Sequence, residues 1–491
     1  MAQGHYKTYL EMVRNGKALT LRQQIILIAA LSFPSILAQI SSVIMGYIDA
    51  SMVGRLGSGE AAAIGLVSTS TWLLGSIVYA SVTGFTVQAA QAIGAKKEHE
   101  AREILRQSLR AIVVVALLLL LIGAAVSPYL PHWLGGTEQI SGQASMYFLI
   151  YSLALPAMGL NALAGGMLQS SGNMKIPGIL NSLMCLLDII FNYFFIFPTR
   201  DYDFAGVTMV IPGFNMGVAG AALGTALAEV VTACLMLSFL MFKSNLGVSR
   251  IGKDEYMKGQ AKSDSSEHID IRSEFTDIVQ GRNYMKKAWV IAAPVAFEHF
   301  VVCFAMVITT RIIAPLGVVA IAANSFAITA ESLCYMPGYG ISDAATTLVG
   351  QSVGAGRKEL ARQFARRTTY IGLIVTVIGS IIMYIMAPFM IGILTNDPQV
   401  LELGTRILRI EVWAEPLYVG SIIISGALRG AGDTLVPSIM NFVSLWAVRL
   451  PLSFLLAARF GLVGAWIAMS SELIFRGVIF LIRLWREKWL K

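Results

Sequence analysis

Charged residues are scarce in this chain. Asp, Glu, Lys and Arg make up 13% of its 491 residues, whereas a soluble protein of this size carries roughly a quarter. Long stretches of alternating hydrophobicity are also missing, which argues against a membrane β-barrel. Apolar runs of about 20 residues, separated by short polar breaks, instead predict an all-α polytopic membrane protein. The hydrophobic share of 56% and the mean hydropathy of +0.68 agree with that class.

Only four cysteines are present, and all four lie inside the apolar runs. Their spacing matches no metal motif, so we expect neither a metal site nor a disulfide. No nucleotide-binding motif is found, and no polar region is large enough to form an ATP-hydrolysing domain. No cofactor is therefore expected, and the chemistry must lie among the apolar runs.

We predict twelve membrane spans, several of them long enough to require tilting or kinks. Pro34 and Pro294, inside the first and seventh spans, are the predicted kink points. The twelve spans are residues 24–53, 61–91, 108–131, 144–167, 177–198, 217–242, 288–314, 318–350, 368–393, 405–427, 437–457 and 462–484.

The chain repeats itself after a shift of 260 residues. Pro34 falls on Pro294, Asn181 on Asn441, and "GGMLQSSGNMKIP" (165–177) on "SGALRGAGDTLVP" (425–437). Six spans per repeat give both halves the same membrane orientation, so we expect two six-helix lobes related by a pseudo-two-fold axis along the membrane normal. The predicted organisation is an N-terminal segment (1–23), a first lobe (24–242), a cytoplasmic linker (243–287), a second lobe (288–485) and a tail (486–491).

Lys and Arg give the orientation. Placing both termini in the cytoplasm puts most of the 37 basic residues on that face, as the positive-inside rule requires. The net charge of +8 then reflects contact with anionic lipid headgroups in a plasma membrane rather than with nucleic acid. No cleavable signal peptide is expected, because the first apolar run is too long.

The repeated motifs and "IDASMVGRLG" at the end of the first span resemble MATE (multidrug and toxic compound extrusion) transporters. The resemblance covers residues 24–485. It implies an antiporter that expels small organic compounds, often cationic, in exchange for Na⁺ or H⁺. We expect the protein to be a monomer. The absence of a nucleotide motif independently requires that any transport be driven by a gradient.

Three polar residues of the first lobe are candidates for cation coupling. Asp188 lies about 16 Å into the fifth span, at a depth where a charge needs a partner or a cavity. Asn192 shares its helix face. Asp49 matches the first-helix aspartate of the family, which takes part in coupling in many members. Related members carry an amide at the position of Met184, so the cluster departs from them there.

The second lobe offers further candidates. Glu298 resembles the seventh-helix acidic residue of NorM-like members and is the fourth predicted cation-coupling residue. The tenth-helix aspartate of those members is missing, and its place falls near Tyr418. Glu411 and Glu415 could replace it, or could neutralise Arg449. We favour a Glu415–Arg449 ion pair, because adjacent antiparallel helices set the two at similar depth. The remaining candidates for a substrate path or ion pair are Glu411, Tyr418 and Asn181.

Asp49 and Asp188 together suggest a mechanism. Burial and neighbouring like charge both favour the protonated form of a carboxylic acid, so such a pair can take up a proton near neutral pH. Competition between the coupling cation and an organic cation would then link their movements. Two alternatives stay open at this point: a lipid-linked oligosaccharide flippase of related architecture, and an intramembrane enzyme.

Overall fold

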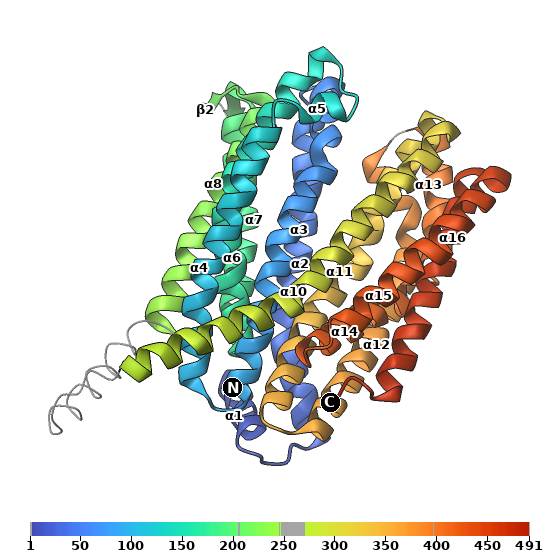
Figure 1. The fold of residues 1–491 in the computed structure, drawn as a ribbon. Coiled ribbons are helices and arrows are strands. Elements are labelled where there is room, and N and C mark those ends of the chain that lie inside the picture. Colours follow the sequence, from blue (N-terminus) through green and yellow to red (C-terminus); the bar gives the residue numbers. More distant parts are fainter. Residues whose placement is uncertain (1, 205–206, 245, 247–270, 396, 491) are drawn as a thin grey trace. The chain divides into compact units, whose positions relative to one another are not determined.

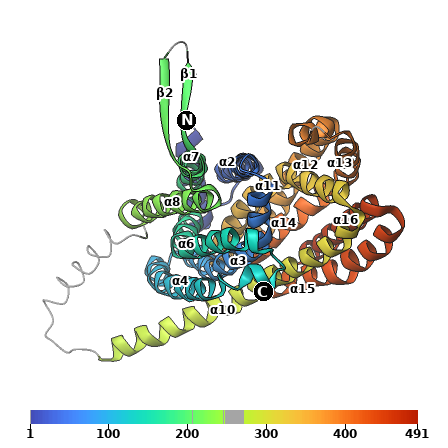
Figure 2. The same ribbon diagram turned by 90° about the horizontal axis from the view of Figure 1, so that it is seen from above.

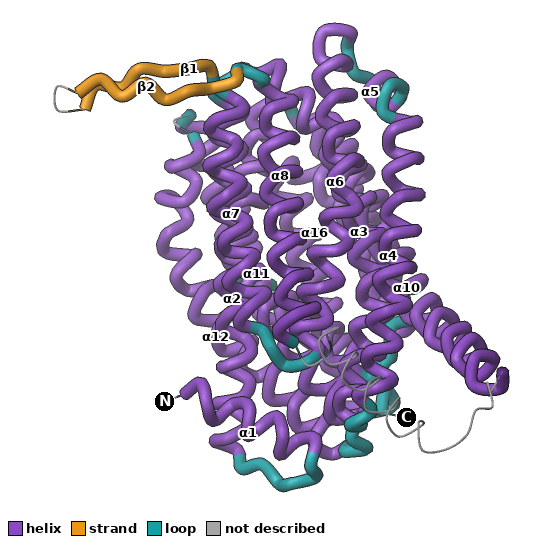
Figure 3. Tube along the Cα trace, turned by 90° about the vertical axis from the view of Figure 1, so that its left-hand side faces the viewer, coloured by secondary structure: helices purple, strands orange, loops and turns teal. Residues whose placement is uncertain are grey.

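The computed structural model describes residues 2–204, 207–244, 246, 271–395 and 397–490, and helices dominate it (Figure 3). Within these residues, ten helices are long and apolar enough to cross a membrane. The all-α polytopic fold predicted from composition is therefore confirmed. Most of the predicted linker, residues 245 and 247–270, lies outside the described residues.

The elements can be followed along the chain in Figure 1. In the first half they are α1 (Ala2–Arg14), α2 (Leu21–Gly54), α3 (Ser58–Gly94), α4 (Glu98–Val126), α5 (Leu130–Trp133), α6 (Glu138–Ser170), α7 (Lys175–Ile196), β1 (Pro198–Phe204), β2 (Val207–Phe214), α8 (Gly217–Ser238) and a π-helical turn (Phe239–Lys243). In the second half they are α10 (Ile271–Ile313), a 3-10 turn (Ala314–Leu316), α11 (Val318–Gly354), α12 (Lys358–Leu394), α13 (Pro398–Glu411), α14 (Glu415–Gly430), α15 (Leu435–Val443), a π-helical segment (Ser444–Arg449) and α16 (Leu450–Arg486).

Two local features reconcile ten long helices with twelve predicted spans. The segment Leu435–Arg486 has 52 residues, about 78 Å if straight, far more than a bilayer of about 30 Å requires. Gly461 divides it with a backbone conformation of φ 60° and ψ −141°, which an L side chain rarely adopts. The predicted tenth span is divided instead into α13 and α14. With these two corrections, the described helices form twelve spans.

Pro416 explains the break between α13 and α14. Proline has no backbone N–H to donate to the carbonyl four residues earlier, here Val412, and its ring crowds that carbonyl. The chain leaves the helix after Glu411 and re-enters it at Glu415. Pro156, which aligns with Pro416 in the repeat, stays inside the continuous helix α6. The same residue thus has different consequences in the two halves.

The chain divides into two compact units. The first-repeat unit comprises residues 44–92 and 97–292, and the second-repeat unit comprises residues 1–43, 93–96 and 293–491. The lobe boundaries predicted from the sequence stay predictions.

Within the first-repeat unit, α6 packs against α4 and α8, and α7 packs against α8. Glycines on α8 allow close approach: a Cβ atom at Gly220 would lie 2.5 Å from the carbonyl oxygen of Phe195. Helices in membranes use small residues in this way because packing, not water exclusion, drives their association. The antiparallel hairpin β1–β2 extends from the end of α7 and returns to α8 (Figure 2).

Within the second-repeat unit, α14 is central and packs against α11, α12 and α16. Its residues from Val419 to Leu428 are all buried. The N-terminal helix α1 is fixed to this unit by Arg357, whose guanidinium donates to the carbonyls of Met12, Val13 and Lys17 at 2.9–3.2 Å. A basic side chain at these carbonyls compensates the unpaired end of α1.

Candidate functional site

A carboxylate–amide cluster lies in the first-repeat unit. Asp188 of α7 is fully buried and Asn192, one turn later, is 1% exposed. The Asn192 side-chain nitrogen Nδ2 donates to Asp188 Oδ2 at 3.1 Å and to Asp49 Oδ1 at 3.0 Å. Asp49 is half-buried near the end of α2. The structure therefore brings together three of the four residues predicted for cation coupling.

The cluster has a deficit of positive charge. No described Lys or Arg forms an ion pair with Asp49 or Asp188, and one amide serves both carboxylates. Asp188 Oδ1 and Asn192 Oδ1 are buried acceptors with no described hydrogen-bond partner. Two carboxylates this close cannot both stay ionised in a dry environment without a cation. The arrangement can hold one proton or one small cation.

Gly224 of α8 leaves the space that Asn192 occupies, because it has no side chain. A Cβ atom at Gly224 would lie 2.9 Å from the Asn192 backbone nitrogen and closer still to its side-chain oxygen. Thr225, the next residue, lies beside the Asp188 carboxyl. Gly224 and Thr225 were not predicted from the sequence. A single small residue in an apolar helix does not indicate a role until the residue that it contacts on the neighbouring helix is known.

Replacing Gly224 by alanine is therefore expected to displace Asn192. Overpacking of a tight interior contact typically costs about 1–3 kcal/mol. Gly165→Ala is the matched control, because a Cβ there would make only ordinary contacts at 3.7 and 3.9 Å. Thermal unfolding of purified protein should show a lower midpoint for Gly224→Ala than for Gly165→Ala. Equal midpoints would mean that Gly224 does not position Asn192.

A second polar pair lies near this cluster. Asn161 of α6 donates to Glu229 Oε2 of α8 at 2.9 Å, and its amide lies 4.0 Å from the Met184 sulfur. Met184 stands where the resemblance places an amide. Here an amide comes from the neighbouring helix α6 instead. The replacement of that amide by Met184 was the sequence feature from which an amide on another helix, here Asn161, could have been expected.

Glu298 of α10 lies in the second-repeat unit and is already well paired. Arg429 Nη2 lies 3.2 and 3.3 Å from its two oxygens, Ser438 Oγ donates at 2.9 Å, and Asn441 Nδ2 donates at 2.6 Å. Both carboxylate oxygens therefore have donors. The predicted coupling role of Glu298 stays a prediction. Asn181, the repeat partner of Asn441, is half-buried on α7, and no described hydrogen bond joins it to Asp49 or Asp188.

The predicted Glu415–Arg449 pair is wrong. Arg449 Nε lies 3.5 Å from Glu472 Oε2, while both oxygens of Glu415 are buried without a described hydrogen-bond partner. Glu472 also binds Arg476 Nη2 at 2.7 Å and accepts a hydrogen bond from Ser444. Arg449 ends a π-helical segment, whose wider turns shift side chains relative to an α-helix. Placing Glu415 and Arg449 at a similar depth in the membrane was therefore not enough to predict which carboxylate pairs with Arg449.

The other second-lobe candidates have defined surroundings. Glu411 Oε2 accepts from Ser470 Oγ at 3.1 Å. Tyr418 packs edge-to-face against Tyr335, with ring centroids 5.5 Å apart, and the Arg476 guanidinium lies 5.7 Å from its ring centroid. A role for these residues in a substrate path stays a prediction.

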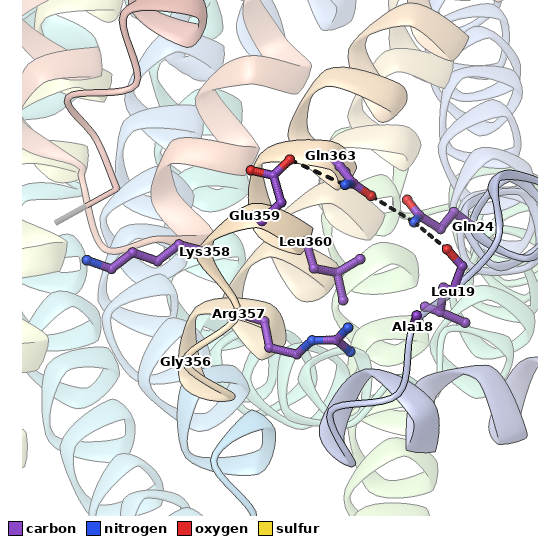
Figure 4. Close-up of a pocket in the computed structure, with 9 residues that line it drawn as sticks. All are labelled: Ala18, Leu19, Gln24, Gly356, Arg357, Lys358, Glu359, Leu360 and Gln363. Carbon is purple, nitrogen blue, oxygen red and sulfur yellow. Dashed lines mark hydrogen bonds between the residues drawn. The ribbon is translucent and has the colours of Figure 1, made fainter.

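A cavity of about 400 Å³ lies elsewhere, between the α1–α2 connection and the start of α12 (Figure 4). Gln363 donates to Glu359 at 3.3 Å, and Gln24 donates to Gln363 at 3.0 Å and to the Leu19 carbonyl at 3.2 Å. These bonds tie the N-terminal connection to α12. The cavity contains none of the predicted site residues.

Comparison with known proteins supports one family for both repeats. The family model MatE matches residues 34–194 and 294–455, two segments that begin 260 residues apart. A probable multidrug resistance protein NorM of Thermotoga maritima is 28% identical over 94% of this chain and 92% of its own. One of the same name from Neisseria meningitidis is 24% identical over 93% of each chain. A solved structure of a MOP superfamily transporter from Pyrococcus furiosus matches 98% of each chain with a TM-score of 0.82. At 17% identity this last likeness shows the fold alone.

Proposed function

The chain belongs to the MatE family of transporters, and on that premise we propose that it is an antiporter that exports organic, drug-like cations in exchange for H⁺ or Na⁺. The names of its relatives support multidrug efflux. The observation that carries the exchange mechanism is the Asp49–Asn192–Asp188 cluster, two carboxylates joined by one amide with no described basic partner.

The cluster supports coupling through its charge. When both carboxylates are ionised, the first-repeat unit contains a negative site that attracts an organic cation or a small ion. When a proton or Na⁺ occupies it, that attraction is lost. Mutual exclusion at one site makes the two bindings reciprocal, which is sufficient for exchange if the site is exposed alternately to the two sides of the membrane.

The excess of Lys and Arg in alternate connections supports a plasma-membrane protein with both termini in the cytoplasm. The pairing of three partly buried arginines weakens the case for a flippase of lipid-linked oligosaccharides, which needs cationic groups for pyrophosphate. Arg429 is paired with Glu298, and both Arg449 and Arg476 are paired with Glu472. Each of these guanidiniums already has a carboxylate partner within the protein.

Drug export is tested most simply in cells that lack their main efflux pumps. Cells expressing the protein should accumulate less ethidium than cells with an empty vector, because expelled cation cannot bind intracellular nucleic acid. Cell fluorescence over time measures the accumulation. Equal fluorescence, with the protein detected in the membrane fraction, would contradict export of this class of compound.

A further inference from the structure

The cavity shown in Figure 4 has no part in the proposed exchange mechanism, and no residue of the Asp49–Asp188 cluster lines it. Its lining residues come from the α1–α2 connection, the start of α2, the α11–α12 connection and the first two turns of α12, all within the second-repeat unit. Its volume of about 400 Å³ falls in the range of small-molecule sites, about 300–1,000 Å³. We call it the α12 cavity.

The start of α12 supplies hydrogen-bond donors to this cavity. The first three residues of the helix, Lys358–Leu360, all line it. Their backbone N–H groups have no carbonyl partner within the helix, and the N-cap residue Arg357 makes no side-chain cap. Free N–H groups at the positive end of a helix favour an anion. The cavity is therefore open to a negatively charged group at the start of α12.

Positive charge adds to these donors. The Nη1 atom of Arg357 serves three carbonyls at the end of α1, whereas no described hydrogen bond uses its Nη2 or Nε. Lys358 is exposed and extends away from Gln24, so it adds charge at the edge of the cavity (Figure 4). The one carboxylate of the lining, Glu359, is already bound by Arg362 and Gln363. Donors and positive charge are therefore in excess.

Gln24 decides which anions fit. It lines the cavity and is 1% exposed. Its Nε2 donates both hydrogens, to the Leu19 carbonyl at 3.2 Å and to Gln363 Oε1 at 3.0 Å. Because a carbonyl oxygen only accepts, the amide cannot be turned round. The Gln24 oxygen Oε1 is left buried with no described partner, and a buried acceptor in that state is costly. A ligand that satisfies it must donate from a hydroxyl or N–H group.

The first repeat offers no equivalent site. The shift of 260 residues places Glu98 of α4 on Lys358 and Glu100 on Leu360. Two carboxylates in the first turn of α4 disfavour an anion, and Lys97 is already bound to Glu100 at 2.8 Å. The donors and charge of the α12 cavity are therefore a feature of the second repeat and not a remnant of duplication.

We propose that the α12 cavity binds a polyol phosphate, the chemistry of a glycerophosphate headgroup. The phosphate accepts from the backbone N–H groups at the start of α12 and from Arg357, and a neighbouring hydroxyl donates to Gln24 Oε1. An anionic phospholipid and a soluble glycerol phosphate share this chemistry, and the side proposed to be cytoplasmic gives access to both. The bound ligand joins the α1–α2 connection to α12.

The test uses full-length protein purified in detergent and delipidated by detergent exchange. Thermal unfolding is followed against the concentration of three probes: short-chain phosphatidylglycerol, short-chain phosphatidylcholine and glycerol 3-phosphate. A ligand that binds the folded protein raises the unfolding midpoint, so the half-saturating concentration reports affinity. The measurement involves no transport, so its failure leaves the proposed export untouched.

Phosphatidylglycerol is expected to half-saturate at a concentration at least about 10-fold lower than phosphatidylcholine, which has neither a net negative charge nor a hydroxyl. Glycerol 3-phosphate binding as tightly as phosphatidylglycerol would support a soluble ligand, and much weaker binding would support the lipid. Equal affinity for the two lipids would overturn the proposal, as would no response to either phosphatidylglycerol or glycerol 3-phosphate.

Two variants locate the response. Gln24→Met keeps the length of the side chain but removes the acceptor, and Lys358→Gln removes a charge from an exposed side chain. Each should raise the half-saturating concentration of phosphatidylglycerol by about 3-fold or more. Lys358→Gln should do so without changing the midpoint of the ligand-free protein, so the site is tested even if Gln24→Met does not fold.

Lys286→Gln is the matched control, because it removes an exposed lysine of α10 in the first-repeat unit. It should bind phosphatidylglycerol like the parent. If Lys286→Gln weakens binding as much as Lys358→Gln, the lipid responds only to overall charge and the proposal is wrong. Unchanged affinity in Lys358→Gln and in folded Gln24→Met would place the ligand elsewhere and would also overturn it.

Discussion

Export driven by an ion gradient should fall by about 10–100-fold when Asp188 is replaced by asparagine, the range of typical coupling energies between two ligands. Asparagine preserves the size of the side chain but cannot gain or lose a proton. Asp188 is fully buried and linked through Asn192 to Asp49. The variant therefore resembles a permanently protonated site, in which substrate can bind but the driving ion no longer displaces it. Dye efflux from everted vesicles under an imposed gradient measures the loss.

Two companions make this result interpretable. Asp49→Asn should show the same defect, because both carboxylates share the Asn192 amide. Asp201→Asn changes an exposed carboxylate of β1 in the same repeat and should transport like the parent. If Asp188→Asn exports at the parent rate under the gradient, the coupling site lies elsewhere, and Glu298 is the first residue to test.

Loss of the Glu472 side chain should have the largest effect on stability. Glu472 is fully buried and binds both Arg449 and Arg476. Glu472→Ala leaves two partly buried guanidiniums without a carboxylate partner, and breaking one buried ion pair already costs about 3–5 kcal/mol. We expect a low yield of folded protein and a lower unfolding midpoint. Glu402→Ala, an exposed glutamate of α13, is the control and should behave like the parent.

A second substitution tests the cause of that effect. Adding Arg449→Met to Glu472→Ala removes one of the stranded charges and should restore part of the lost stability, because residues in one network are coupled. If Glu472→Ala unfolds at the same temperature as Glu402→Ala, the ion network does not contribute to folding. If Glu472→Ala is destabilised but Arg449→Met restores nothing, the stranded charge of Arg449 is not the cause.

The sequence was most informative where physical cost is highest. Asp188 was predicted from its depth alone, because a charge in the middle of an apolar helix requires a reason. The spans followed from hydropathy, and the internal repeat followed from the 260-residue shift. Asn192 followed from helical spacing, since residues four apart share a face. These arguments need only the position of a residue along its own helix.

Contacts between helices were harder to predict. The partner of Arg449 depended on a π-helical segment that hydropathy does not show. Gly224 and Asn161 matter through what they touch, and neither their charge nor their spacing distinguishes them. Pro156 and Pro416 align in the repeat, yet only the second lies at a helix break.

The central claim is that an ion gradient drives export through the Asp49–Asp188 cluster. The most direct test is purified protein in liposomes, with a fluorescent cation as substrate and an imposed gradient of H⁺ or Na⁺ as the only energy source. We expect uptake against the substrate gradient with one of the two ions, no such uptake without that ion gradient, and uptake reduced by about 10–100-fold in Asp188→Asn. Transport that proceeds equally with and without both ion gradients would contradict the account.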